Sequence, residues 1–156
     1  MLRLLAAQLR VAGDGPEAGL LDGMAGVIRL GSLPGEVVRQ EMSRAVALVV
    51  PSIWYENFPR TIVEAFACGL PVIASRIGAL ADIVSEGETG LLFEPGNPQD
   101  LADKLAWAQA HPAEMDAMGR NARAKYEAEF SAEVNYRRMM EIYGGVLAEC
   151  QKKHNE

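Results

Sequence analysis

The stretch from Ala45 to Arg76 constrains the fold of this chain most, because it places an apolar strand, a polar loop, a helix and a second apolar strand in that order. The run from Val46 to Val50 is wholly apolar, which is typical of a strand covered on both faces in a parallel sheet. A second apolar run covers Val72 to Ala74. The intervening segment is long enough for a right-handed crossover, so we expect the two strands to be parallel.

The loop after the first strand, residues 51–60, is expected at the carboxyl edge of the sheet, where open parallel sheets bind their ligands. It offers Glu56 as a hydrogen-bond acceptor, together with three aromatic side chains. Thr61 and Glu64 fit the S/T-x-x-E capping box, which predicts a helix from about Thr61. The N–H groups and positive dipole end of that helix would face the crevice, and we expect an anion such as a diphosphate to bind there.

Strands and helices alternate along the rest of the chain, which predicts an α/β fold with a doubly wound, Rossmann-like parallel sheet and C-terminal helices. A good N-cap, Asn97, precedes Pro98 at the first helical position. The last helix is expected to begin after Ser131, and the residues beyond it are expected to form a frayed tail. The other expected strands cover residues 8–12, 27–30 and 90–93. The other expected helices cover residues 17–24, 36–45, 79–85, 98–110, 113–130 and 132–147. The expected tail covers residues 148–156.

Length and composition indicate a single globular domain and argue against several other classes of protein. The chain has 156 residues, of which 49% are hydrophobic, so we expect one packed domain over residues 1–147. A net charge of −6 with scattered basic residues argues against nucleic-acid binding. No apolar run approaches the ~20 residues that span a bilayer, and the N-terminus lacks the pattern of a signal peptide. Two cysteines suggest no disulfide framework, and neither histidine has metal-ligand neighbours. The sequence therefore predicts a soluble cytoplasmic protein without a metal site.

The motifs of the central stretch carry a family resemblance. Glu56 is followed by Asn57-Phe58-Pro59, and Glu64 begins the segment EAFACGLPVIAS. The later segments IGALADIVSEGETGLLFEPGNPQDLA and MGRNARAKYEAEFS come in the order expected for the same family. This set resembles the donor site and C-terminal domain of retaining glycosyltransferases of family 4, and it covers most of the chain from Leu9 onward. The resemblance implies a partial GT-B fold, consisting of most of the donor-binding C-terminal domain.

The resemblance also implies roles for individual residues. The substrate would be a nucleotide-diphospho-sugar, such as a UDP-, GDP- or ADP-sugar, with no cofactor. Glu56 is similar to the first motif glutamate, placed near the donor sugar, and is the candidate catalytic residue. Glu64 is similar to the second, which accepts hydrogen bonds from the ribose hydroxyls. Retaining transfer in this family is usually described as same-face displacement assisted by the leaving phosphate. The implied donor-binding set is Gly13, Leu30, Gly31, Ser32, Glu56, Asn57, Phe58, Pro59, Arg60, Thr61 and Glu64.

Each of these residues also has a simpler interpretation. Glu64 could only close the capping box. Glu56 could be an ordinary exposed carboxylate. The guanidinium of Arg60 could bind phosphate or only be solvated. The glycines from Gly13 to Gly19 miss the G-x-G-x-x-G spacing, so a dinucleotide fingerprint is not expected.

The resembling domain normally begins with a strand, a glycine-rich loop bearing Arg or Lys, and a helix, and it follows an acceptor-binding domain. We expect this chain to start after that first unit and to lack a counterpart of the acceptor-binding domain. We therefore expect a hexosyltransferase of polysaccharide biosynthesis that transfers a sugar to a glycan or lipid-linked acceptor, and that is inactive unless the missing half is supplied in cis or in trans. One alternative is a non-catalytic nucleotide-sugar-binding subunit of a split enzyme. Another is a truncated product without function, whose exposed sheet edge promotes aggregation. No side chain identifies the base, the sugar or the acceptor.

Overall fold

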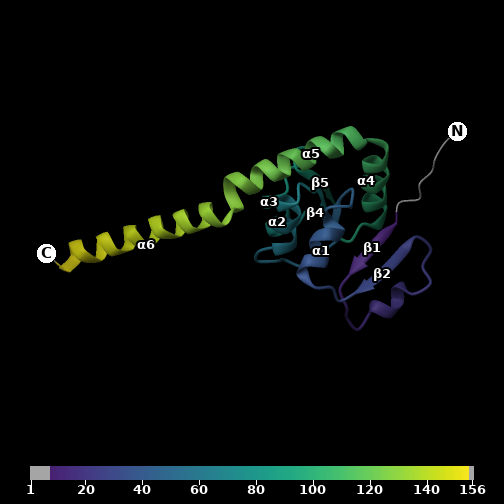
Figure 1. The fold of residues 1–156 in the computed structure, drawn as a ribbon, viewed down its shortest axis with the longest axis horizontal. Coiled ribbons are helices and arrows are strands. Elements are labelled where there is room, and N and C mark those ends of the chain that lie inside the picture. Colours follow the sequence, from purple (N-terminus) through teal and green to yellow (C-terminus); the bar gives the residue numbers. More distant parts are fainter. Residues whose placement is uncertain (1–7, 155–156) are drawn as a thin grey trace.

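The computed structural model describes residues 8–154, in which parallel strands alternate with helices (Figure 1). Residues 1–7 and 155–156, which belong to the expected domain and the expected tail, lie outside this range. The strands are β1 (Leu9–Ala12), β2 (Val27–Gly31), β3 (Leu48–Val50), β4 (Val72–Ser75) and β5 (Gly90–Phe93). The helices are α1 (Gly35–Met42), α2 (Arg60–Ala67), α3 (Gly78–Ile83), α4 (Pro98–Ala110), α5 (Pro112–Lys125) and α6 (Ala132–His154). The expected α/β class is confirmed.

The strands form two hydrogen-bonded sheets. β1 pairs with β2 in one, and the other has the order β3-β4-β5, with every pair parallel. The expected parallel partners of the central stretch are confirmed, because Leu48 lies opposite Val72. β3 is shorter than its apolar run, since pairing begins at Leu48. In both sheets the loops that leave the carboxyl ends of neighbouring strands lie at a common edge.

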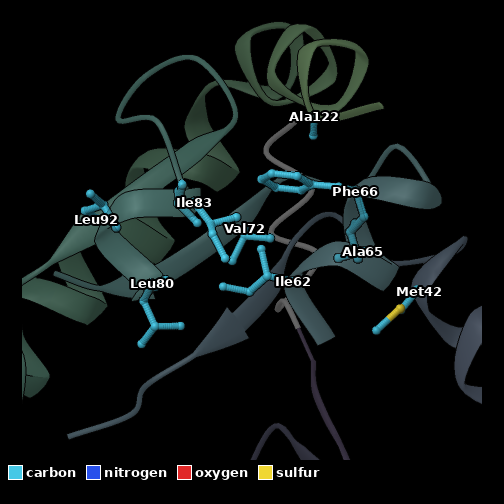
Figure 2. Packing of buried hydrophobic residues seen from close by; sticks show 12 residues of the cluster. Met42, Ile62, Ala65, Phe66, Val72, Leu80, Ile83, Leu92 and Ala122 are labelled. Atoms are coloured by element: carbon cyan, nitrogen blue, oxygen red, sulfur yellow. The ribbon is translucent and has the colours of Figure 1, made fainter. Parts of the chain in front are cut away.

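The core lies on both faces of β4. On one face Ile62 and Phe66 of α2 pack against Val72, and the Phe66 ring also lies beside Ala122 of α5 (Figure 2). On the other face Ile73 joins a second cluster that includes residues of β5, α4 and α5. Successive residues of a strand point to opposite faces, so β4 is covered on both sides as its apolar sequence predicts.

The C-terminal helices differ in part from expectation. α4 has the predicted bounds, and the side chain of Asn97 accepts hydrogen bonds from the backbone N–H groups of Gln99 and Asp100, both at 3.1 Å. α5 continues as a π-helical turn, η2 (Tyr126–Phe130). α6 extends to His154, past residue 147 where the sequence predicts its end, and projects away from the body of the molecule (Figure 1). Among the described residues, no helix is both long and apolar enough to cross a membrane.

The N-terminal part contains less helix than the sequence predicts. The expected helix over residues 17–24 is a short 3-10 helix, η1 (Ala18–Leu21), without buried residues. α1 ends at Met42 rather than at residue 45. η1 has no buried residue and α1 has only Met42 buried, so both segments bury little apolar surface. Helices of this length depend on such burial for their stability.

Candidate functional site

The loop between β3 and α2, residues 51–59, leaves the carboxyl end of β3 and carries most of the candidate residues. It is fixed at its end by Pro59, which is fully buried. The Phe58 ring lies 6.4 Å from the ring of Phe130 in η2, while 55% of the side chain remains exposed. Trp54 and Tyr55 are more exposed still. The loop is therefore fixed at Pro59 and exposes its aromatic side chains to solvent.

Tyr55 also contacts the start of α3. A Cβ atom at Gly78 would lie 2.9 Å from Cδ1 of the Tyr55 ring, and Gly78 has a φ of +47°. Both facts favour glycine, because a side chain would meet the ring and would be strained in a left-handed conformation. Gly78 thus supports the loop, a role that the sequence analysis missed. The only sequence signal was a glycine between an apolar strand and a helix.

Ser75 is a second residue that the sequence analysis missed. It ends β4 at the same edge of the sheet, and it is fully buried. Its hydroxyl has no hydrogen-bond partner among the described residues. Buried polar groups usually form a hydrogen bond, so the unpaired hydroxyl of Ser75 is an exception that lies beside the loops at this edge of the sheet.

α2 begins at Arg60, and its N-cap residue, Pro59, provides no side-chain hydrogen bond. The predicted capping box is therefore wrong. The helix starts one residue earlier than expected, so Thr61 lies within the first turn and cannot act as the cap. The first turn receives no side-chain acceptor, and this leaves the positive end of the helix available to an anion.

Glu64 is instead paired with Arg60. Its Oε1 atom accepts hydrogen bonds from Nη2 of Arg60 at 2.9 Å and from Nε at 3.3 Å. The side chain of Arg60 is 83% exposed, and its guanidinium forms an ion pair with Glu64. Arg39 at the end of α1 has a raised pKa, chiefly because of its hydrogen bond and ion pair with Glu36, with smaller contributions from the charges of Cys68 and Glu64. Among the described residues, Arg60 is thus the ion-pair partner of Glu64.

Glu56, the candidate catalytic residue, is exposed, as are Asn57 and Thr61. Among the described side chains, none forms a hydrogen bond or an ion pair with the Glu56 carboxylate. Its position at the rim of the sheet leaves it accessible to a substrate.

The candidate residues after β1 and β2 form a second group. The backbone N–H of Gly13 donates a hydrogen bond to the carbonyl of Gly31 at 2.8 Å, which brings these two predicted loops together. Gly31 has a φ of +66°, a conformation that favours glycine. Leu30 is half-buried and Ser32 is exposed. This group belongs to the β1–β2 sheet, and no hydrogen bond among the described residues joins it to the group from Glu56 to Glu64.

Other parts of the described chain offer no competing site of this kind. No group of His, Cys, Asp or Glu residues within it could hold a metal ion. A surface cavity of about 570 Å³ lies near the amino ends of β3 and β4, beside α5, and is lined by none of the candidate residues. The carboxyl edge of the sheets therefore remains the place where the candidate residues gather.

Comparison with known proteins gives consistent matches. Residues 4–125 match the family described as glycosyl transferases group 1. The sulfoquinovosyl transferase SQD2 of Arabidopsis thaliana is 34% identical over 134 residues, which are 81% of this chain and 26% of that protein. Sucrose-phosphate synthase from Thermosynechococcus elongatus superimposes with a TM-score of 0.81 and 33% identity, over 91% of this chain and 39% of its own.

A further structure is similar and contains a ligand. HepE from Anabaena, solved in complex with UDP-glucose, aligns over 88% of this chain and 41% of its own, with a TM-score of 0.78 and 25% identity. The chain thus spans less than half the length of each of these relatives, and only 26% of the Arabidopsis protein.

Proposed function

The chain belongs to the glycosyl transferases group 1 family, and from this premise we propose that it is the donor-binding C-terminal domain of a retaining family 4 glycosyltransferase. Its α/β architecture resembles that of GT-B glycosyltransferase domains. The observation that carries the proposal is the uncapped start of α2, which follows Glu56 and lies one turn before Glu64 at the carboxyl edge of the sheet. The UDP-glucose bound by the similar HepE structure supports a nucleotide-diphospho-sugar as the ligand.

The diphosphate would bind at the first turn of α2. An anion at a helix N-terminus gains about 0.3–1 kcal/mol from the helix dipole at an exposed site. The amides of Arg60 and Thr61 would face it. Arg60 itself places positive charge at the positive end of the helix, which is unfavourable until an anion binds. A bound diphosphate removes that repulsion.

Binding would also exchange partners at Glu64. Ribose hydroxyls would donate to the Glu64 carboxylate in place of Arg60, and the guanidinium would turn to the phosphate. An exposed ion pair contributes about 0–1 kcal/mol, whereas hydrogen bonds to charged groups contribute about 1.5–3 kcal/mol. The exchange therefore favours the bound state.

Glu56 would lie beside the donor sugar. In retaining transfer the bond between the anomeric carbon and the diphosphate oxygen breaks, and the acceptor oxygen bonds to the same face of that carbon. The acceptor proton passes to the leaving phosphate. The Glu56 carboxylate would orient the sugar and balance positive charge that develops at the anomeric carbon. Backbone groups of Asn57, Phe58 and Pro59 would meet sugar hydroxyls, while Gly13, Leu30, Gly31 and Ser32 would line the nucleobase.

The isolated chain is proposed to transfer little or no sugar. The acceptor would bind to a further half of the enzyme, supplied in cis or in trans, because the longer relatives contain much that this chain does not match. We place the reaction, hexosyl transfer to a glycan or lipid-linked acceptor, in the cytoplasm. The half-buried Cys68 is a free thiol, which suits a reducing compartment.

Calorimetric titration with UDP, GDP and ADP tests the donor site. Glu64→Gln should lower the affinity for the preferred nucleotide by about tenfold or more, as expected for a lost hydrogen bond to a charged group. Glu127→Gln is the matched control, since Glu127 of η2 forms the same i,i+4 pair with Arg123 of α5, at 2.7 Å. Equal affinity in the two variants would contradict the proposed role of Glu64.

A further inference from the structure

The loop between β3 and α2 exposes four large apolar side chains close together in the chain. The exposed fractions are 58% for Ile53, 75% for Trp54, 82% for Tyr55 and 55% for Phe58. Single exposed apolar residues are normal, whereas a contiguous apolar patch on a folded protein marks a surface that binds something. Tryptophan is on average a highly buried residue, so the exposed pair Trp54 and Tyr55 indicates a binding surface.

Contacts within the domain hold this pair in place. The hydroxyl of Ser52 donates a hydrogen bond to the carbonyl of Trp54 at 3.2 Å and accepts one from its backbone N–H at 3.4 Å. A Cβ atom at Gly78 would lie within 4 Å of three atoms of the Tyr55 ring, so one edge of the ring rests on the start of α3. A surface whose conformation is already fixed loses less conformational entropy when it binds a ligand.

Polar groups that can bind hydroxyls lie directly beside the aromatic pair. Glu56 and Asn57 are the next two residues of the loop, and both are exposed. A sugar ring has flat C–H faces and a rim of hydroxyl groups. Aromatic side chains next to a carboxylate and an amide therefore match the chemistry of a saccharide, because such sites combine apolar contact with a few polar groups that orient the ligand.

Charge argues against an anionic membrane surface as the occupant. Residues 51–59 contain no Lys or Arg, and the whole chain carries a net charge of −6. The next basic residue along the chain, Arg60, is paired with Glu64. Binding to anionic lipids depends on clusters of basic residues, and this loop has none.

The neighbouring carboxylate also argues against a protein partner. Trp and Tyr are common anchors of protein interfaces, so the aromatic pair alone would fit one. The centre of a protein interface is depleted of charged residues, however, and Glu56 follows the pair directly. A saccharide is the occupant that uses both the rings and the carboxylate.

We propose that Trp54 and Tyr55 form a platform on which a sugar residue of the acceptor glycan stacks. The inference rests on the proposed function, in which the donor sugar lies beside Glu56. The Tyr55 ring lies at the start of α3, whereas the diphosphate is assigned to the start of α2, so the platform and the nucleotide site lie beside different helices. The platform holds a sugar residue other than the one that reacts, and this remote contact helps to position the acceptor.

NMR of the full chain tests the platform directly, because the chain contains two tryptophans and therefore two indole N–H groups. The Trp54 signal should shift when cellohexaose, maltohexaose or chitohexaose is added at millimolar concentration. The Trp107 signal is the internal reference, since this half-buried ring stacks on His111 with a centroid distance of 4.2 Å. Trp54→Phe assigns the two signals.

Matched variants separate stacking from general apolar contact, with the backbone N–H signals of Glu56 and Asn57 as the readout. Trp54→Leu keeps an apolar side chain without an aromatic face and should weaken binding by about tenfold, whereas Trp54→Phe should retain most of the affinity. Tyr136→Ala is the control, because Tyr136 is an aromatic residue of α6 that is 62% exposed and lies outside the loop. It should bind as the wild type does, and circular dichroism verifies that each variant is folded.

Two results would overturn the platform. One is a Trp54 signal that none of the three saccharides shifts in a folded, monomeric sample. The other is a Trp54 signal that shifts with protein concentration but not with saccharide, which would identify the patch as a docking surface for a second copy of the chain.

A parallel titration with UDP, GDP and ADP separates this inference from the proposed function. Binding of a nucleotide without binding of a saccharide would contradict the platform alone. Binding of a saccharide at Trp54 without binding of any nucleotide would support the platform and contradict the donor site.

Discussion

Replacement of Gly78 by alanine should destabilise the domain through two separate effects. The left-handed conformation, with a φ of +47°, costs a residue with a Cβ about 1–2 kcal/mol. The new Cβ would also lie 2.9 Å from the ring of Tyr55, which must shift. Because Tyr55 is 82% exposed, the ring can move, and an off-rotamer position costs about 0.5–1.5 kcal/mol. The expected loss is therefore about 1.5–3.5 kcal/mol.

Gly87→Ala separates the two effects. Gly87 has a φ of +75°, and no atom lies within 4 Å of the place that its Cβ would take, so this variant should show only the conformational cost of about 1–2 kcal/mol. Urea denaturation followed by circular dichroism measures both losses. At about 2–4 °C per kcal/mol for a chain of this size, Gly78→Ala should lower the melting temperature by about 3–14 °C.

A double-mutant cycle with Tyr55→Ala then isolates the contact. Without the ring, Gly78→Ala should cost no more than Gly87→Ala, because the steric part has been removed. If Gly78→Ala costs the same with and without Tyr55, the ring does not rest on Gly78. The support of the Glu56 loop inferred from that contact would then be refuted.

Three further predictions concern the fold. Phe66→Ala removes a fully buried ring and should lower the free energy of unfolding by about 3–5 kcal/mol in urea denaturation, and a loss below 1 kcal/mol would contradict its central place in the core. Asn97→Ala should lower the free energy of unfolding by about 1 kcal/mol because α4 loses its cap. Asn97→Asp should keep the stability of the wild type, because aspartate also caps a helix. The hydrogen bond from Arg10 lowers the pKa of Glu41, so its stabilising effect is present above the ordinary carboxyl pKa of about 4.3 and is lost as the pH falls through the lowered value. The stability difference between the wild type and Glu41→Gln should therefore vanish in acid, and a difference that persists at pH 2 would contradict the pairing.

The sequence predicted the bounds of those helices and strands whose ends are set by residues beside them in the chain. The bounds of α4 follow from Asn97 and Pro98, and those of β5 from a short apolar run that begins at Gly90. The membership of the glycosyltransferase family also followed from local motifs, since the loop and helix around Glu56 and Glu64 are contiguous in sequence. These features need no knowledge of distant contacts.

Features set by distant contacts could not be read from the sequence. β3 starts at Leu48 because its pairing with β4 begins there. The division into two sheets depends on which strands form hydrogen bonds with each other, and those strands are distant in the sequence. The capping box failed because Thr61 fits the pattern but the helix begins at Arg60. The contact between Tyr55 and Gly78 joins two loops, and neither residue carries a local signal of it.

The most direct test of the proposed donor site is a thermal-shift titration of the full chain with UDP, GDP and ADP. At a concentration of about 100 times the Kd, a ligand that binds only the folded state adds ~2.7 kcal/mol of stability. For a chain of this size the melting temperature should rise by about 5–11 °C with one nucleotide and less with the other two. A folded, monomeric sample whose melting temperature does not change with any of the three at millimolar concentration would contradict the proposal that this chain binds a nucleotide-sugar donor.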